Sequence, residues 1–357
     1  MVYRSGVIPA KRPSNGALAV ASLPCAFVPQ SVWAAFAFFQ ASPVPNIFKP
    51  ESTPAEAIHR LSNFVLIITA LIFIVVFSLL AYVVVKFYQR GTGDNREPAP
   101  VYGSNQVELA WTVIPGLIVL VLFLATARVI YSVQEAVPPP GAIQVIAVGH
   151  QYWWEFRYPK LGVVTANELH VPVSNPSNPT PTFVKLLSAD TDHSFWVPQL
   201  AGKTDLIPNR ENSIWIDPHA AGMYVGQCAQ YCGIQHAKML LRVYADTPDQ
   251  FDKWVAAQKE PALSNDSVIA GRRIFEQTSC INCHAISGTV ATGRFGPDLT
   301  HLMSRDTIAS GAAPNTHENL ELWIRSPDAI KPGSLMPAMN LSEPELKAVT
   351  AYLESLR

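Results

Sequence analysis

Two long runs without charge dominate the hydrophobic pattern in the first third of the chain. Residues 61–85 carry no charged side chain. A helix of this length reaches about 37 Å, which exceeds the roughly 30 Å hydrocarbon core of a bilayer. Residues 109–127 form a second uncharged run, and its internal Pro115 is tolerable because membrane helices admit proline. The pattern predicts a transmembrane hairpin over residues 42–136, with spans at about 61–85 and 109–130.

The charges around these runs predict the orientation of the hairpin. Lys86, Arg90 and Arg96 lie between the runs, whereas Arg60 and Arg128 flank them and weaken the bias. Because cytoplasmic loops carry an excess of lysine and arginine, we expect the connecting loop in the cytoplasm and both flanks outside. The alternative is a pair of buried core helices in a soluble protein, which the length of the first run disfavours.

The start of the chain has the pattern of an export signal. Lys11 and Arg12 precede a stretch without charge that extends from residue 13 to residue 48. This pattern predicts a signal peptide over residues 1–41, with a retained membrane anchor as the alternative. It predicts no role for Cys25.

Beyond residue 141 the pattern changes to short apolar and aromatic segments bounded by proline, glycine, asparagine and aspartate. Such segments are typical of the strands of a small β-sandwich or barrel. The strands are expected to end near Ala245, and residues 248–258 have the pattern of a closing helix. We therefore predict a β-sandwich domain over residues 142–258.

The end of the chain is helical in pattern. Residues 259–266 form a polar linker with one proline, which predicts a domain boundary. Residues 267–357 are expected to form an all-α domain, and Ser342 and Glu345 have the spacing of a capping box.

Composition agrees with a membrane protein and disfavours a nucleic-acid partner. The 357 residues are 49% hydrophobic and only 15% charged, with a net charge of -1. Lysine and arginine are scattered, so no basic face is available for nucleic acid. Four of the five cysteines form two tight pairs, each followed closely by a histidine, which favours metal or cofactor chemistry over a disulfide framework.

The segment GQCAQYCGIQHAKM, residues 226–239, combines two cysteines with a histidine and a methionine. Thiolate and thioether sulfur favour soft ions, and imidazole suits copper and zinc, so this set indicates copper. A structural zinc site would not use Met239, and a disulfide between Cys228 and Cys232 would leave His236 and Met239 without a role.

A copper site on a β-sandwich needs a further histidine from a distant strand. His193 is the natural candidate, and the competing candidates are His150, His170 and His219. Two thiolates four residues apart can bridge two copper ions and give each ion a histidine and one weak axial ligand. Sharing the electron over two ions lowers the barrier to transfer.

A second motif, CINCH at residues 280–284, has the Cys-x-x-Cys-His spacing of covalent haem c attachment. Cys280 and Cys283 would bond the haem vinyl groups, and His284 would be an axial ligand of the iron. A redox dithiol would require a thioredoxin-like setting, and half of a zinc site would require another cysteine or histidine pair downstream. The sequence contains neither.

These motifs resemble subunit II of the haem-copper cytochrome c oxidases, fused to a class I cytochrome c domain. The resemblance rests on GQCAQYCGIQHAKM, DHSFWVP, GHQYWWEFRYP, ELAWTVIP and CINCH. It implies a multi-domain membrane protein with a transmembrane hairpin, a cupredoxin-like β-sandwich and an all-α cytochrome c domain. The copper A ligands that it implies are His193, Cys228, Gln230 through its backbone carbonyl, Cys232, His236 and Met239.

The resemblance also implies the second axial ligand of the haem iron. A methionine before a proline is expected at this position, because Met/His ligation raises the iron potential. This selects Met336 of KPGSLMPAMN, with Met339 as a packing residue and Met303 as a less favoured alternative.

Three further positions follow from the resemblance or depart from it. Glu108 matches a glutamate at the start of a proton path into subunit I, although a solvated carboxylate is its ordinary interpretation. Gln230 stands where many members have a glutamate that helps to hold magnesium, so magnesium is not predicted. Tyr152, Trp153 and Trp154 lie in the electron-input segment, but Tyr152 departs from the tryptophan of mitochondrial-type members, and the aromatic residues can equally serve as core.

The implied function is electron input into a terminal oxidase. Electrons from cytochrome c or a cytochrome c reductase complex would pass through haem c and two copper ions to subunit I. Oxygen reduction, coupled to proton pumping, would occur in that partner among further oxidase subunits, so this chain carries no catalytic residue. The expected location is the bacterial inner membrane, multi-pass, with both redox domains on the periplasmic side. Intramolecular electron transfer from a fused cytochrome benefits from a high effective concentration. The alternative functions are a subunit of a nitric oxide reductase and a membrane-anchored copper chaperone.

Overall fold

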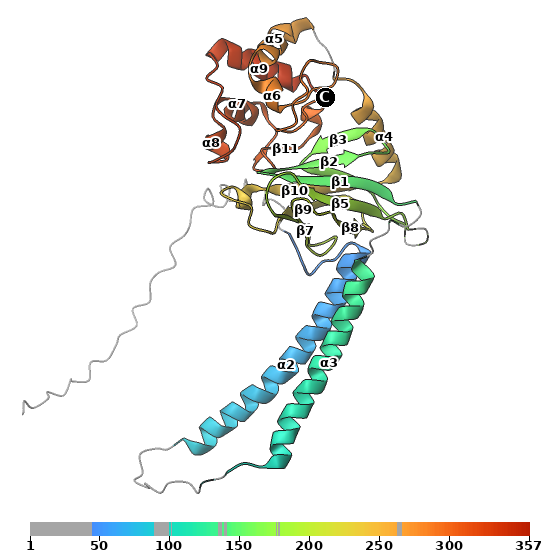
Figure 1. The fold of residues 1–357 in the computed structure, drawn as a ribbon, viewed down its shortest axis with the longest axis vertical. Coiled ribbons are helices and arrows are strands. Elements are labelled where there is room, and N and C mark those ends of the chain that lie inside the picture. Colours follow the sequence, from blue (N-terminus) through green and yellow to red (C-terminus); the bar gives the residue numbers. More distant parts are fainter. Residues whose placement is uncertain are drawn as a thin grey trace, which may run out of the picture. The chain divides into compact units, whose positions relative to one another are not determined.

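Two long apolar helices begin the described part of the chain. α2 spans Thr53–Phe87 and α3 spans Asn105–Val133, and the helices run side by side (Figure 1). Their most apolar windows have mean hydropathies of 3.1 and 2.5 and contain no buried residue. An apolar surface of this extent requires lipid or a protein partner. The predicted spans lie inside these helices.

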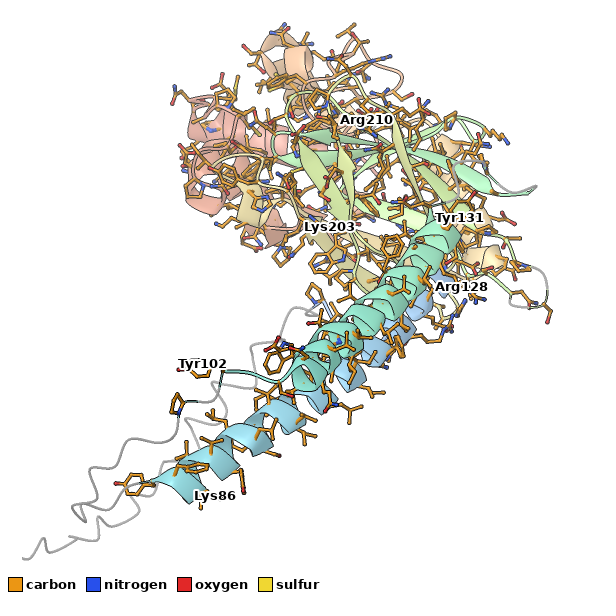
Figure 2. The ribbon with its side chains drawn as sticks, turned by 60° about the horizontal axis from the view of Figure 1, so that its bottom comes forward. Lys86, Tyr102, Arg128, Tyr131, Lys203 and Arg210 are labelled. Carbon is orange, nitrogen blue, oxygen red and sulfur yellow. The ribbon has the colours of Figure 1, made fainter. Side chains whose placement is uncertain are left out.

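The polar and aromatic ends of the hairpin agree with a membrane-spanning role. Figure 2 shows Lys86 toward the end of α2, and Arg128 and Tyr131 toward the opposite end of the hairpin. Apolar side chains cover the helix surfaces between these ends. Charged and aromatic side chains at both ends are typical of helices anchored at the two interfaces of a bilayer.

The computed structural model describes residues 45–88, 100, 102–134, 138, 141–175, 177, 179–262 and 266–357. The predicted signal peptide, Cys25, Arg90 and Arg96 lie outside these residues. The described residues from 45 onward belong to one compact unit.

A β-sandwich follows the hairpin. Among the described residues it consists of two five-stranded sheets, in the orders β3-β2-β1-β5-β8 and β4-β10-β9-β6-β7. Large side chains such as Trp154, Phe156 and Phe195 are fully buried between the sheets. The strands are β1 Ile143–His150, β2 Trp153–Tyr158, β3 Val163–Ala166, β4 Glu168–Pro172, β5 Thr182–Ser188, β6 His193–Trp196, β7 Thr204–Leu206, β8 Asn212–Ile216, β9 Gly222–Cys228 and β10 Leu240–Asp246.

The hairpin is joined to the sandwich by polar contacts at the first turn of α2. Thr53 Oγ1 donates to Asp217 Oδ2 at 2.6 Å, and the Asp217 amide donates to Ser52 Oγ at 2.9 Å.

The helix α4 (Pro248–Lys259) follows the last strand and begins with a capping box between Thr247 and Gln250. Such reciprocal bonds satisfy amides that a helix start leaves without partners.

The C-terminal domain is built mainly from short helices. α5 and α9 pack so closely that a Cβ on Gly271 would lie 1.9 Å from the Ala348 carbonyl oxygen. The predicted capping box of Ser342 and Glu345 is confirmed at the start of α9. The elements are η2 Asp266–Val268, α5 Ile269–Gln277, α6 Cys280–Cys283, η3 Leu302–Ser304, β11 Thr307–Ile308, β12 Ala313–Pro314, α7 His317–Arg325, α8 Pro327–Ile330 and α9 Glu343–Glu354. The predicted architecture of hairpin, sandwich and helical domain is confirmed.

Candidate metal centres

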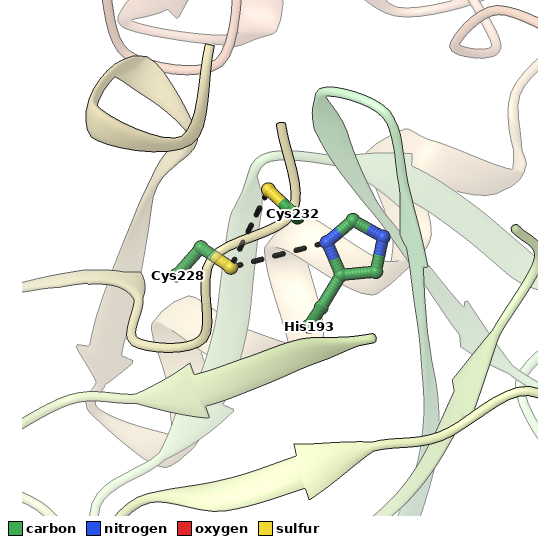
Figure 3. A group of neighbouring side chains, drawn as sticks. All are labelled: His193, Cys228 and Cys232. Atoms are coloured by element: carbon green, nitrogen blue, oxygen red, sulfur yellow. Dashed lines mark hydrogen bonds between the residues drawn. The ribbon is translucent and has the colours of Figure 1, made fainter. Parts of the chain in front are cut away.

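Cys228 and Cys232 lie close together at the end of β9 and in the loop that follows. Both are free and 3% exposed, and their sulfur atoms are 3.9 Å apart (Figure 3). A disulfide would bring the sulfurs to about 2.05 Å. The pair therefore presents two separate thiol groups.

The other predicted copper donors surround this pair. His193 Nδ1 lies 3.9 Å from Cys228 Sγ, and the Gln230 carbonyl oxygen lies 3.2 Å from the same sulfur. His236 Nδ1 and Met239 Sδ lie 3.7 Å and 3.8 Å from Cys232 Sγ. The structure thus brings all six predicted donors together. Thiol, thioether, imidazole and carbonyl groups in this combination fit copper.

The strand pairing explains how residues 35 positions apart meet. Phe195 of β6 pairs with Cys228 of β9, which places His193 beside the cysteine. The Cys228 amide donates to the Met239 carbonyl at 2.9 Å, so the loop between β9 and β10 closes on itself. His193 also packs over Gly149, where a Cβ would lie 2.7 Å from the ring carbon Cδ2.

Asp190 orients His193 and was missed by the sequence reasoning. Its Oδ1 lies 2.8 Å from His193 Nε2, which leaves Nδ1 to face Cys228. Burial favours a higher pKa for Asp190, but hydrogen bonds from His193 and from the Gln151 and Thr191 amides lower this pKa below its ordinary value. A carboxylate on the second ring nitrogen is a common feature of metal-binding histidines. The position of this acidic residue, three before His193, was the sequence feature that could have indicated its role.

The two thiols have strongly different acidities. The hydrogen bond between the two thiols lowers the pKa of Cys228 and raises the pKa of Cys232. Two neighbouring thiolates repel each other, so a shared proton or a bound cation stabilises the pair.

The competing histidines have other partners. His150 lies 3.1 Å from Glu155, His170 Nδ1 lies 2.7 Å from Asp246, and His219 lies between Glu56 and Asp217. Among the described residues, only His193 of the four candidates reaches the cysteine pair.

The three aromatic residues occupy different positions. Trp154 is fully buried, and its ring lies 6.2 Å from that of His193 and 5.8 Å from that of Phe195. Trp153 stacks on His150 at 4.2 Å. Tyr152 is half-buried, and its hydroxyl accepts a hydrogen bond from the Ile234 amide at 3.2 Å. Tyr152 is therefore the residue of this run that touches the loop carrying the donors.

The CINCH motif lies at α6 of the helical domain. Cys280 and Cys283 are free, and His284 Nδ1 lies 2.8 Å from the Pro297 carbonyl oxygen, which leaves Nε2 to serve as a ligand. Burial lowers the pKa of His284, which favours the neutral ring that a metal requires. A Cβ on Gly296 would lie 2.6 Å from this ring, so only glycine fits there.

A largely apolar cavity extends from this motif. His284 and both cysteines line it, together with Met336 and Met339, whereas Met303 does not. Two thiols, a histidine and a methionine around one apolar space fit a covalently attached haem. Gln151, Tyr152 and Trp153 of the sandwich line the same cavity.

Glu108 lies apart from both centres. It is in the first turn of α3 and is exposed, beside Gly103. The structure does not bring this carboxylate to either donor cluster.

Three segments of the chain match known families. They are described as cytochrome C oxidase subunit II, transmembrane domain, over residues 41–129, the periplasmic domain of the same subunit over residues 176–245, and cytochrome c over residues 268–357. Cytochrome c oxidase subunit 2 of Alkalihalophilus pseudofirmus is 35% identical over 315 residues, which cover 86% of this chain and 90% of that relative. The chain belongs to the cytochrome c oxidase subunit 2 family.

Further relatives have the same name. Cytochrome c oxidase subunit 2 of Bacillus subtilis is 31% identical over 298 residues, which cover 77% of this chain and 82% of the relative. The crystal structure of the periplasmic domain of subunit II of cytochrome oxidase (CoxB) of Bradyrhizobium japonicum is similar at 28% identity, covering 34% of this chain and 97% of that chain with a TM-score of 0.32.

Family membership confirms the predicted resemblance and the enzyme class, a subunit of a haem-copper oxidase. The cytochrome c match implies haem c, and the subunit II match implies copper A. Together with the two apolar helices, the matches indicate a membrane-anchored protein with periplasmic domains. The relatives favour the oxidase over the nitric oxide reductase and chaperone alternatives.

Proposed function

We propose that this chain is the electron-input subunit of a terminal oxidase in the bacterial inner membrane. Electrons from cytochrome c or a cytochrome c reductase complex pass through haem c and copper A to the haem-copper subunit I. That subunit reduces oxygen and pumps protons. When bound, haem c and copper A supply reversible one-electron chemistry.

The main support for this proposal is the turn between β1 and β2, which contacts both candidate centres. Gln151 and Tyr152 line the cavity beside the CINCH motif. Gln151 Nε2 also donates to the Cys232 carbonyl at 2.7 Å, and the Tyr152 hydroxyl accepts from the Ile234 amide. The turn between β1 and β2 therefore contacts both the haem cavity and the copper loop, which supports direct communication between them.

The geometry supports the following residue roles. His193, Cys228, Gln230, Cys232, His236 and Met239 would hold the two copper ions of the proposed centre, and Asp190 keeps Nδ1 of His193 directed at the cysteine pair. His284 and Met336 would hold the haem iron, and Cys280 and Cys283 would attach the haem covalently. Glu108 is the proposed start of a proton path into subunit I.

The test is purification of the intact complex from its native membrane. The expected composition is two copper ions and one haem c in this chain, with a mixed-valence copper spectrum. Oxygen consumption driven by reduced cytochrome c supports the oxidase, whereas consumption of nitric oxide alone contradicts it. Protease cleavage of both redox domains in right-side-out membrane vesicles tests their periplasmic location.

A further inference from the structure

Glu168, the first residue of β4 in the sandwich, has its hydrogen-bond partners in the cytochrome domain. It is 2% exposed, and its carboxylate accepts from the Thr307 amide at 2.9 Å, the Thr307 hydroxyl at 2.8 Å and the Asp306 amide at 3.1 Å. Hydrogen bonds to a carboxylate are among the strong ones, and an unpaired buried carboxylate is costly. Glu168 therefore requires the cytochrome domain as its partner.

Lys331 makes the reciprocal contact from the cytochrome domain. It is 3% exposed, and its ammonium group donates to the Tyr152 carbonyl at 2.6 Å and to the Ala309 carbonyl at 3.3 Å. Lysine is almost never fully buried without a partner. Burial lowers the pKa of Lys331 to about 7, because removing its ammonium group from water is unfavourable. The hydrogen bond to the Tyr152 carbonyl offsets this desolvation cost.

Further bonds surround these two side chains. The Leu240 amide donates to the Ser310 carbonyl at 3.1 Å, and Ser310 Oγ donates to the Leu240 carbonyl at 2.9 Å. Lys238 Nζ donates to the Ile330 carbonyl at 2.7 Å, and Gln235 Nε2 donates to the Pro332 carbonyl. Both Gln235 and Lys238 belong to the loop that carries the copper donors.

The backbone of the cytochrome domain is strained at this contact. Ala309 and Ser310 have φ values of 53° and 61°, in the left-handed region that residues with a Cβ rarely adopt. Such a conformation is unfavourable for a residue with a Cβ and persists only where its surroundings hold it. Here the bonds to Leu240 and Lys331 hold the segment.

We propose that the cytochrome domain is seated on the copper domain in one fixed position, with Glu168 and Lys331 as positioning residues for transfer between the two centres. This inference rests on the proposed function. It adds that direct contacts fix the position of the cytochrome domain, whereas the linker alone would only tether it. The seated domain contacts Tyr152 through Lys331 and the copper loop through the carbonyls of Ile330 and Pro332.

The first experiment measures reduction of copper by photoreduced haem c in the intact oxidase at increasing glycerol concentration. A fixed contact gives a rate independent of viscosity, because no domain movement precedes transfer. Glu168→Ala and Lys331→Met are expected to slow transfer about tenfold or more and to make it viscosity-dependent, since small misplacements are costly. The matched controls Glu211→Ala and Lys160→Met change exposed side chains of the sandwich and are expected to behave as wild type.

The second experiment measures hydrogen exchange of the Thr307 and Leu240 amides in the same complexes. Protection in the wild type that is lost in Glu168→Ala supports the seated domain, and equal exchange in both proteins overturns it. A wild-type transfer rate that falls with viscosity also overturns it. If no electron reaches copper in the wild type although both amides are protected, the proposed function fails and the seated domain stands. Haem and copper contents confirm that each variant is folded.

Discussion

Asp190 Oδ1 lies 2.8 Å from Nε2 of His193, and the opposite ring nitrogen faces Cys228 Sγ at 3.9 Å. The carboxylate thereby fixes which nitrogen of the ring is available to a metal. His193 is fully buried, so its orientation has no help from solvent. This relationship makes Asp190 a supporting residue of the proposed copper site, because Asp190 orients one of its donors.

Asp190→Asn should therefore weaken copper binding while leaving the fold intact. Loss of an acidic partner on a metal-binding histidine lowers affinity by roughly 10- to 100-fold. Copper titration followed by the mixed-valence spectrum measures the effect. Asp192→Asn, two residues away and exposed, is the matched control and should bind copper as wild type does. Unchanged affinity in Asp190→Asn would show that the hydrogen bond has no role in metal binding.

Met336 and Met339 both line the haem cavity, and they should differ in function. Met336→Ala is expected to abolish the thioether-to-iron absorption band and to lower the reduction potential, because methionine ligation raises it. Met339→Ala should retain the band. Potentiometric titration of the purified complex measures both variants, and loss of the band in Met339→Ala alone would reverse the assignment.

Gly271 permits the close packing of α5 on α9. A Cβ at this position would lie 1.9 Å from the Ala348 carbonyl oxygen, so Gly271→Ala must push the helices apart. The expected loss of stability is about 1–3 kcal/mol. Thermal unfolding followed at the haem absorption gives the value. Arg273→Ala on the exposed side of the same helix is the control and should change stability little.

Glu155 gives the sandwich a defined dependence on pH. Burial favours a higher pKa, but hydrogen bonds from His150 and Arg157 lower the pKa of Glu155 from 4.5 to about 2. A lowered pKa stabilises the fold above about pH 4.5, and this contribution, about 2–3 kcal/mol, is lost as the pH falls toward 2.

Glu155→Gln should therefore destabilise the sandwich near neutral pH, with the difference from wild type shrinking between pH 4.5 and about 2. Denaturant unfolding at a series of pH values measures this difference. Glu211→Gln, on an exposed side chain, should show no comparable trend. A constant difference across the series would mean that the charge of Glu155 contributes nothing.

Several features of this protein were determined by the sequence alone because they depend on neighbouring residues. The length of the two apolar runs predicted the helices that became α2 and α3. Cys228 ends β9, and Cys232, His236 and Met239 follow it in the next loop, so one short segment brings these four donors together. The CINCH motif is equally local, because α6 alone holds its two cysteines beside His284.

The tertiary structure decided the features that depend on distant partners. His193 was one of four candidate histidines until the pairing of β6 with β9 placed it beside Cys228. Glu168 and Lys331 have the sequence character of ordinary surface residues, and their partners lie 139 and 179 positions away. Whether a charged side chain is buried depends on which surfaces of the two domains meet. The hydrophobic pattern and the motif spacing carry no information on which surfaces these are. The contact between the cytochrome and copper domains therefore exists only at the level of tertiary structure.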